Sequence, residues 1–227
     1  MPFLGDQGPG KSETIGGCES RSLLELGVTV LEMRPEARDV FEEKLEVQGK
    51  APGKTGLKRR IIAIDPGTER SAVVTIDVDG EVSGQILENH ALESWLRDWH
   101  QKSKWCCCVE MIACYGQRVG REVFETCVWI GKFMSAWQTH QTAEPARLVR
   151  RDVKMELCAT NRANDADIRA ALIDLYGPGK AKAVGLKASP GPLYGFKRDM
   201  WAALAVAVTF ERMLDRGGTS TDDVETG

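Results

Sequence analysis

The segment WCCCVEM, from Trp105 to Met111, restricts the possible folds more than any other part of the chain. It is a short apolar run that carries one charge, Glu110, and such a run is typical of a central strand buried on both faces of a sheet. A carboxylate in that position is rarely buried unless it is paired or binds a metal. The alternative is an exposed edge strand, which the apolar flanks of Glu110 disfavour. Glu110 is therefore a candidate functional residue.

Cys106, Cys107 and Cys108 in this segment are predicted to be small buried strand residues rather than metal ligands. Adjacent residues in a strand point to opposite faces, so three in a row cannot converge on one ion. The chain has only three histidines, and they lie far from the acidic motifs, which also disfavours a zinc site.

Apolar and alternating runs predict an α/β fold with a mixed sheet of about five strands flanked by helices. Strands are expected at 60–64, 71–77, 81–87, 105–111 and 146–149. Helices are expected near 92–99, 119–140, 152–158, 165–175 and 199–214. The first three strands follow one another through short turns, which favours an antiparallel meander. The later strands alternate with helices.

The two ends of the chain differ in composition from the part between them. Residues 1–59 predict a flexible or weakly structured extension, and residues 214–227 predict a disordered acidic tail. The run GDQGPGKS, Gly5 to Ser12, matches a phosphate-binding P-loop pattern, but it lacks the preceding strand and the following helix that such a loop requires. We interpret it as a chance match. The organised domain is expected at 60–213.

Composition places few limits on location and partners. The sequence shows no secretory leader and no apolar run long enough to cross a membrane, so we expect a cytoplasmic protein with reduced thiols and no membrane partner. The formal net charge is only -3. Any nucleic-acid site must therefore be a local basic patch or use metal ions.

Two further carboxylates lie at the ends of predicted elements. Asp65 ends the strand in IIAIDPGT, and Asp199 opens the apolar helix DMWAALAVAVTF. Ligands of α/β proteins bind at the carboxyl ends of central strands, so Asp65, Glu110 and Asp199 are expected at one edge of the sheet. Carboxylates suit Mg²⁺ or Mn²⁺, and paired ions of this kind serve phosphoryl transfer. The alternatives are a turn residue for Asp65 and a helix N-cap for Asp199.

Four segments in this order resemble the RuvC-type Holliday junction resolvases, in particular their phage and prophage branch: IAIDPGTERSAVV, VEMIACYG with VGREVFETCVWIGKF, DADIRAALIDLYG and PGPLYGFKRDMWAALAVAVTF. The resemblance covers about residues 60–212. It implies an RNase H-like fold and hydrolysis of phosphodiester bonds in four-way DNA junctions. It also implies that Asp65, Glu110 and Asp199 are catalytic and hold two Mg²⁺ ions, for which Mn²⁺ can substitute.

The last helix departs from the family pattern. The family often carries a second acidic residue three positions after the first, where this chain has Ala202. Asp165, in NRANDADIRAAL, is the preferred replacement as a metal ligand, with Asp167 second. The alternative for Asp165 is the N-cap of the helix that it begins.

Clustered basic residues are expected to hold the phosphates of branched DNA, with ordinary solvated surface as the alternative. Tyr115, close after Glu110 in the sequence, is expected to stack on an opened base or to pack in the core. The predicted nucleic-acid-binding residues are Tyr115, Arg118, Arg150, Arg151, Lys154, Arg169, Lys187 and Lys197.

The predicted helix 119–140 is apolar on two sides. One side is expected to meet the sheet, and the other to form a two-fold homodimer interface, as the resemblance implies. The alternative is that other core elements cover the second side. One stripe contains Val123, Cys127, Ile130, Met134 and Trp137, and the second includes Phe124, Trp129 and Phe133.

The sequence thus predicts a Mg²⁺-dependent endodeoxyribonuclease that cuts four-way junctions. One alternative is another RNase H-like nuclease that acts on flaps, branched DNA or RNA–DNA hybrids. The other is a branched-DNA-binding module without catalysis, because Ala202 leaves the metal site one carboxylate short.

Overall fold

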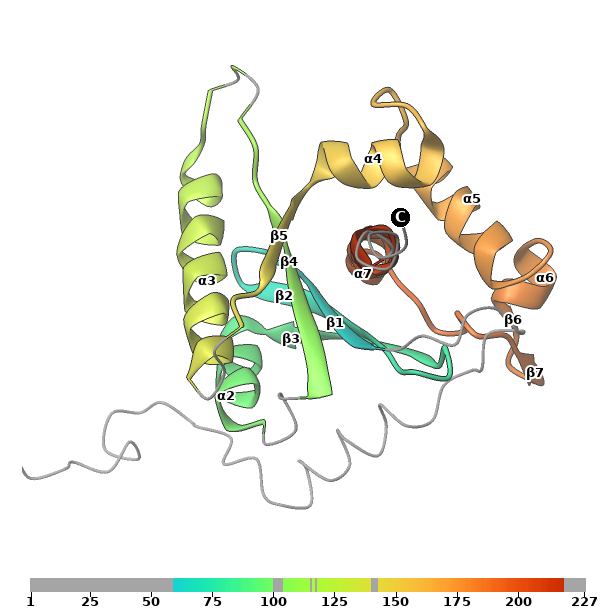
Figure 1. Cartoon of the computed structure of the whole chain (residues 1–227). Coiled ribbons are helices and arrows are strands. Elements are labelled where there is room, and N and C mark those ends of the chain that lie inside the picture. The colour runs from blue at the N-terminus through green and yellow to red at the C-terminus, as the bar shows by residue number, and fades with distance from the viewer. Residues whose placement is uncertain (1–58, 100–103, 115, 117, 140–142, 219–227) are drawn as a thin grey trace, which may run out of the picture. The chain divides into compact units, whose positions relative to one another are not determined.

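The computed structural model describes residues 59–99, 104–114, 116, 118–139 and 143–218. At its centre is a five-stranded sheet with the order β3-β2-β1-β4-β5 (Figure 1). The first three strands pair antiparallel, and β4 and β5 run parallel to β1. Their bounds are β1 Arg60–Asp65, β2 Arg70–Ile76, β3 Val82–Glu88, β4 Trp105–Met111 and β5 Ala146–Val149. The predicted mixed five-stranded sheet is confirmed.

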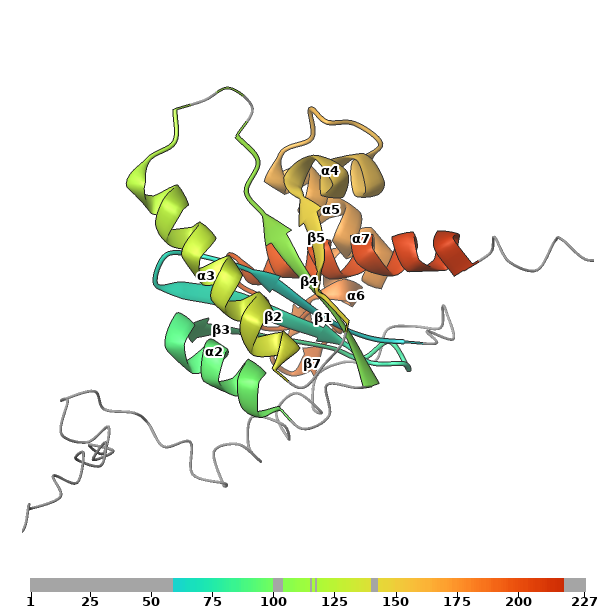
Figure 2. The same cartoon turned by 60° about the vertical axis from the view of Figure 1, so that its left-hand side comes forward.

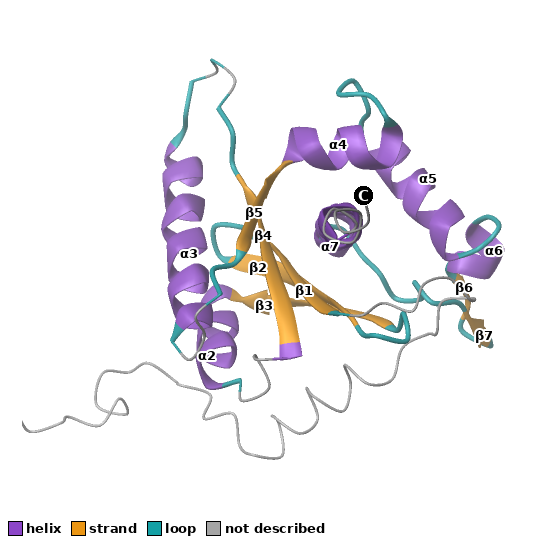
Figure 3. Cartoon of the chain, in the orientation of Figure 1, coloured by secondary structure: helices purple, strands orange, loops and turns teal. Residues whose placement is uncertain are grey.

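Helices flank this sheet, as predicted (Figure 3). They are α2 Asn89–Asp98, α3 Arg121–Gln138, α4 Arg150–Cys158, α5 Asp165–Tyr176, α6 Lys180–Ala183 and α7 Met200–Gly218. The sequence analysis missed α6 and the small hairpin of β6 (Gly185–Leu186) and β7 (Ser189–Pro190). These elements are too short to show a periodic pattern. Residues 1–58, which hold almost all of the predicted extension and its P-loop match, lie outside the described residues. The prediction that a disordered tail begins at residue 214 is wrong for residues 214–218, which continue α7, and residues 219–227 lie outside the described residues.

The two faces of the sheet carry different helices (Figures 1 and 2). On one face α7 packs on β1, β2 and β4, and α4 and α5 pack against α7 in turn. On the other face α2 and α3 pack on each other, with α2 against β2 and β3 and α3 against β4. Residues 203–208 of α7 are almost completely buried, because this helix is covered on several sides. Within the described residues, no helix is both long and apolar enough to cross a membrane.

The alternation of side chains in β4 decides which face carries Glu110. Cys108 is buried in the cluster that contains the apolar residues of α7, so Glu110, two residues later, points to the same face. Cys107 and Val109 point to the opposite face and are also buried. Burial raises the pKa of the Cys108 thiol well above its usual range, which keeps it protonated. The prediction of buried strand cysteines is confirmed for Cys107 and Cys108.

Helix α3 has one buried and one exposed face, and they differ from the two predicted stripes. Ile130, Phe133 and Trp137 are buried, although Phe133 was placed on the other stripe. Phe124 and Val128 are exposed, by 63% and 59%.

Candidate active site

The register of the sheet brings residues from three neighbouring parallel strands to one edge. Ile64 of β1 lies opposite Val109 of β4, so Asp65 and Glu110 follow at adjacent strand ends. Glu110 in turn lies opposite Leu148 of β5, and Arg150 begins α4 directly after that strand. Asp65 and Glu110 also share the face covered by α7. The carboxyl end of a central strand is a common ligand-binding position in α/β folds.

Other residues stabilise the loop after Asp65. The backbone N–H of Gly67 donates to Ser71 Oγ at 3.1 Å, and Asn89 Nδ2 donates to the Gly67 carbonyl at 2.9 Å. Ser71 Oγ also donates to Asn89 Oδ1 at 2.6 Å, and both side chains are buried. A Cβ atom at Gly67 would lie 2.3 Å from the Arg70 carbonyl oxygen, so only glycine fits there. Since this network holds the loop, the Asp65 carboxyl remains available to the site.

Asp65 and Glu110 form a hydrogen-bonded carboxyl pair. Burial raises the pKa of Asp65 to about 8, and the nearby charges of Glu110 and Asp199 add to the rise. Burial also raises the pKa of Glu110, while Arg150 and the hydrogen bond from Asp65 oppose that rise. Two neighbouring carboxyls that are both shielded from water disfavour ionisation of each other, so the pair resists carrying two negative charges. A pair of largely buried carboxyls with raised pKa values is typical of functional sites.

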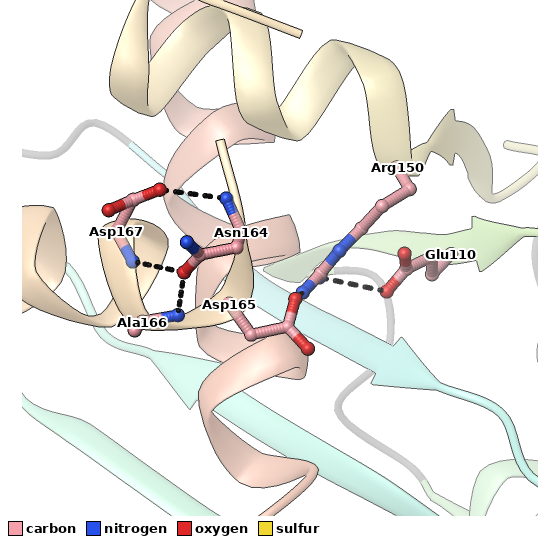
Figure 4. Close-up of polar contacts among 6 residues, drawn as sticks. All are labelled: Glu110, Arg150, Asn164, Asp165, Ala166 and Asp167. Carbon is pink, nitrogen blue, oxygen red and sulfur yellow. Dashed lines mark hydrogen bonds and ion pairs between the residues drawn. The ribbon is translucent and has the colours of Figure 1, made fainter. Parts of the chain in front are cut away.

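Arg150 connects this pair to the start of α5 (Figure 4). Its Nη1 atom lies 3.7 Å from Glu110 Oε2, and its Nη2 atom donates to Asp165 Oδ1. The Glu110 side chain is 14% exposed, whereas that of Asp165 is 85% exposed. One guanidinium thus bridges a buried and a solvated carboxylate.

Asp165 does not cap α5, contrary to one of the two interpretations from the sequence. The N-cap is Asn164, whose side chain accepts hydrogen bonds from the backbone N–H groups of Ala166 and Asp167 (Figure 4). Asp167 completes the capping box by accepting from the Asn164 N–H at 2.8 Å. With the cap supplied by Asn164, the Asp165 side chain is free to turn to Arg150. Asp167, the second candidate ligand, is used in the cap.

Asp199 lies immediately before α7 and is exposed, and its carbonyl accepts the N–H of Ala203 at 3.0 Å. Its charge acts on Asp65, which places it in the neighbourhood of the pair. Among the described residues, however, no three His, Cys, Asp or Glu side chains gather closely enough to hold a metal ion. The structure therefore brings Asp65 and Glu110 into contact, with Asp165 and Asp199 beside them but not in one tight cluster.

A basic pocket of about 440 Å³ shares Arg150 with the carboxyl site. It is lined by Arg150, Arg151, Lys154 and Asn161, and three of these were predicted to bind nucleic acid. Asn161 was missed because it stands in a connection without a periodic pattern. The remaining predicted residues are spread out. Arg118 precedes α3, Arg169 stacks on Trp201 from α5, Lys187 lies between β6 and β7, Lys197 precedes α7, and Tyr115 lies outside the described residues.

The raised pKa of Asp65 predicts a pH-dependent stability for the metal-free protein. The ordinary pKa is 3.8 and the folded value is about 8, so the folded state binds more protons between these values. The free energy of unfolding should therefore fall as the pH rises from about 4 to about 8, by an amount on the order of several kcal/mol. The asparagine side chain of the Asp65→Asn variant cannot ionise, so this variant should not lose stability in that pH range.

The free energy of unfolding, measured with urea in the presence of chelator at pH 5, 7 and 9, tests the prediction. Asp174→Asn, on the exposed side of α5, is the control. If the free energy of unfolding changed with pH equally in the two variants, the prediction would be contradicted.

The comparison with known proteins bears on the fold. No protein-family model matches the chain, and no curated protein matches it. Among solved structures, RuvC of Thermus thermophilus is similar, with a TM-score of 0.52 and 17% identity over 70% of this chain and 97% of that chain. T. thermophilus RuvC in complex with a Holliday junction substrate is similar too, with a TM-score of 0.52 and 18% identity over 71% and 97% of the two chains. The chain therefore has the α/β, RNase H-like fold of RuvC, with a mixed five-stranded sheet and flanking helices.

Proposed function

We propose that the chain is a divalent-metal-dependent endonuclease that cuts branched DNA, with four-way junctions as its substrate. The observation that carries this proposal is the buried Asp65–Glu110 pair at the ends of β1 and β4, next to a basic pocket. The fold supports it, since a similar solved structure is RuvC in complex with a Holliday junction substrate. The likeness to phage and prophage members rests on the sequence motifs alone. In this proposal residues 60–213 form the nuclease domain.

The side chains at the site fit Mg²⁺, or Mn²⁺ in its place, better than zinc. All the donors are carboxylate oxygens, which hard divalent ions prefer, and Cys108 is buried and protonated. Asp65 and Glu110 would hold the metal, with Asp199 and Asp165 as the flanking carboxylates. When bound, such an ion lowers the pKa of an attacking water and stabilises the leaving oxygen.

The chain's own residues supply the other requirements of hydrolysis. The raised pKa of Asp65 opposes its ionisation, and a carboxyl must be ionised to act as a metal ligand. Arg150, Arg151 and Lys154 present positive charge to the DNA backbone beside the pair. Burial of Asp65 and Glu110 limits the access of bulk water and strengthens their electrostatic effect.

The exposed face of α3 supports a homodimer. Phe124 and Val128 are large and apolar, and Cys127 between them is exposed as well. These residues follow one another at helical spacing on the side of α3 that faces away from the sheet. A two-fold dimer through this face would present two equivalent sites to the two matched strands of a junction.

A branched-DNA-binding protein without catalysis is the second candidate function. It is favoured by Ala202 and by the absence of a tight three-carboxylate cluster among the described residues. The two functions make different predictions for the same assay.

The assay uses a labelled four-way junction, a matched duplex and an RNA–DNA hybrid, each with Mg²⁺, Mn²⁺ or chelator. We expect paired nicks in opposite strands of the junction, only when a metal is present. Cleavage of the hybrid instead would support another RNase H-like nuclease. Tight junction binding without cleavage under either metal would overturn the endonuclease proposal in favour of the binding module.

A further inference from the structure

Arg150 is the one described residue that belongs to both the carboxyl site and the basic pocket. Its Nη2 atom is hydrogen-bonded to Asp165, and its Nη1 atom lies 3.7 Å from Glu110 Oε2. The same side chain lines the pocket together with Arg151, Lys154 and Asn161. It is 28% exposed, so it lies at the boundary between the buried pair and the solvent.

The guanidinium of Arg150 is only partly satisfied by these two carboxylates. Its Nη1 atom is buried and donates no hydrogen bond within the described part of the chain. The distance of 3.7 Å to Glu110 gives electrostatic attraction but is too long for a hydrogen bond. A planar guanidinium binds a phosphate with two parallel donors, which is the geometry that Arg150 does not achieve with Glu110.

The position of Arg150 also places it in competition with a metal. A cation that bridges Glu110 and Asp165 neutralises the negative charge that a divalent ion needs. The Arg150 guanidinium and a divalent metal ion on the same carboxylates therefore repel each other. DNA in the pocket offers the guanidinium a different anion, the backbone phosphate, within the reach of the same side chain.

We propose that Arg150 is an exchangeable counter-ion that couples DNA binding to metal binding. In the DNA-free protein it neutralises Glu110 and Asp165. When a backbone phosphate occupies the pocket, Arg150 turns to that phosphate and leaves the carboxylates to the metal. This inference rests on the proposed function and names how its site is regulated. Because coupling between two ligands is reciprocal, DNA raises the affinity for metal by the same factor that metal raises the affinity for DNA.

Two variants of adjacent arginines separate this role from a general effect of charge. Arg150→Gln removes the guanidinium that bridges Glu110 and Asp165. Arg151 is exposed, and Arg151→Gln removes an equal charge from the same pocket without removing that bridge. Without DNA, Arg150→Gln should bind Mn²⁺ about tenfold more tightly than the wild type, and Arg151→Gln should bind it about as the wild type does. The electron paramagnetic resonance signal of free Mn²⁺ measures this affinity for the full chain.

The coupling is measured through the affinity for a fluorescent four-way junction in chelator and in Ca²⁺. We expect Ca²⁺ to tighten junction binding by about tenfold or more in the wild type. Arg151→Gln should bind the junction more weakly in both conditions, with the same ratio. In Arg150→Gln, Ca²⁺ should no longer tighten junction binding. Arg150→Lys keeps the charge but not the planar guanidinium, and it serves as a second variant if Arg150→Gln unfolds. It should bind Mn²⁺ as weakly as the wild type does. It should also lose most of the tightening of junction binding by Ca²⁺.

The outcomes distinguish this inference from the proposed function. If the wild type binds Mn²⁺ at a site that Asp65→Asn abolishes, but Arg150→Gln and Arg151→Gln behave alike, Arg150 is not an exchangeable counter-ion and the metal site stands. If neither the wild type nor Arg150→Gln has an Asp65-dependent Mn²⁺ site, the proposed function and this inference both fail. If Arg150→Gln binds Mn²⁺ more tightly and Arg151→Gln does not, and if Ca²⁺ no longer tightens junction binding in Arg150→Gln, the proposed function and this inference are both supported.

Discussion

Asp65→Asn is expected to lower the rate of junction cleavage by a factor on the order of 10³ or more, with little change in junction affinity. The substitution removes a ligand charge from the buried pair but keeps the size and the loop network of Ser71 and Asn89. Glu110→Gln should have a similar effect, because the two carboxyls form one unit. The double variant should therefore be hardly slower than either single one. Single-turnover cleavage of a labelled junction in Mg²⁺ measures the rates.

Asp174→Asn, an exposed change on α5, is the control and should cleave at the wild-type rate. If Asp65→Asn retained a rate within tenfold of the wild type, the carboxyl pair would not be the catalytic centre. A loss of both cleavage and junction binding would indicate misfolding instead, and thermal unfolding of the variant detects that case.

The paired change Phe124→Glu and Val128→Glu is expected to abolish the proposed homodimer. These side chains are 63% and 59% exposed, so charges there do not enter the core, but they would repel each other across a two-fold interface. Light scattering after gel filtration should then give the 25.0 kDa mass of one chain instead of twice that mass. Junctions should receive single, unpaired nicks, because the two sites are no longer held together.

Gln138→Glu adds a single negative charge at an exposed polar position of α3, and this variant should remain dimeric. A wild-type protein that is already a monomer at micromolar concentration would contradict the dimer, as would a double variant that keeps twice the chain mass.

The sheet could be predicted from the sequence because each strand has its own local pattern. The run WCCCVEM is apolar on both sides of the strand, and the structure places it in the interior of the sheet between β1 and β5. The same argument placed Glu110 inside the fold, and the parallel register then set it beside Asp65. The faces of α3 were harder to assign, since a helix that is apolar on two sides does not reveal which side meets the sheet.

The connections within the site could not be predicted in the same way. Arg150 and Asp165 are fifteen residues apart, and their contact depends on the turn between α4 and α5. Asn164 and Asp165 are both good cap residues, so only the structure shows that Asn164 caps α5 and that Asp165 faces Arg150. The role of Arg150 as a bridge between carboxylates has no sequence signature, because a basic residue after a strand is also typical of a solvated surface.

Anomalous scattering from crystals soaked in Mn²⁺ tests the central claim most directly, namely that Asp65 and Glu110 form a divalent-metal site. We expect a peak within about 2.0–2.6 Å of carboxylate oxygens of both residues, the range of metal–oxygen bonds to hard cations, and no peak in Asp65→Asn crystals. A wild-type crystal whose carboxyl pair stays hydrogen-bonded at saturating Mn²⁺, with no peak beside it, would contradict the account.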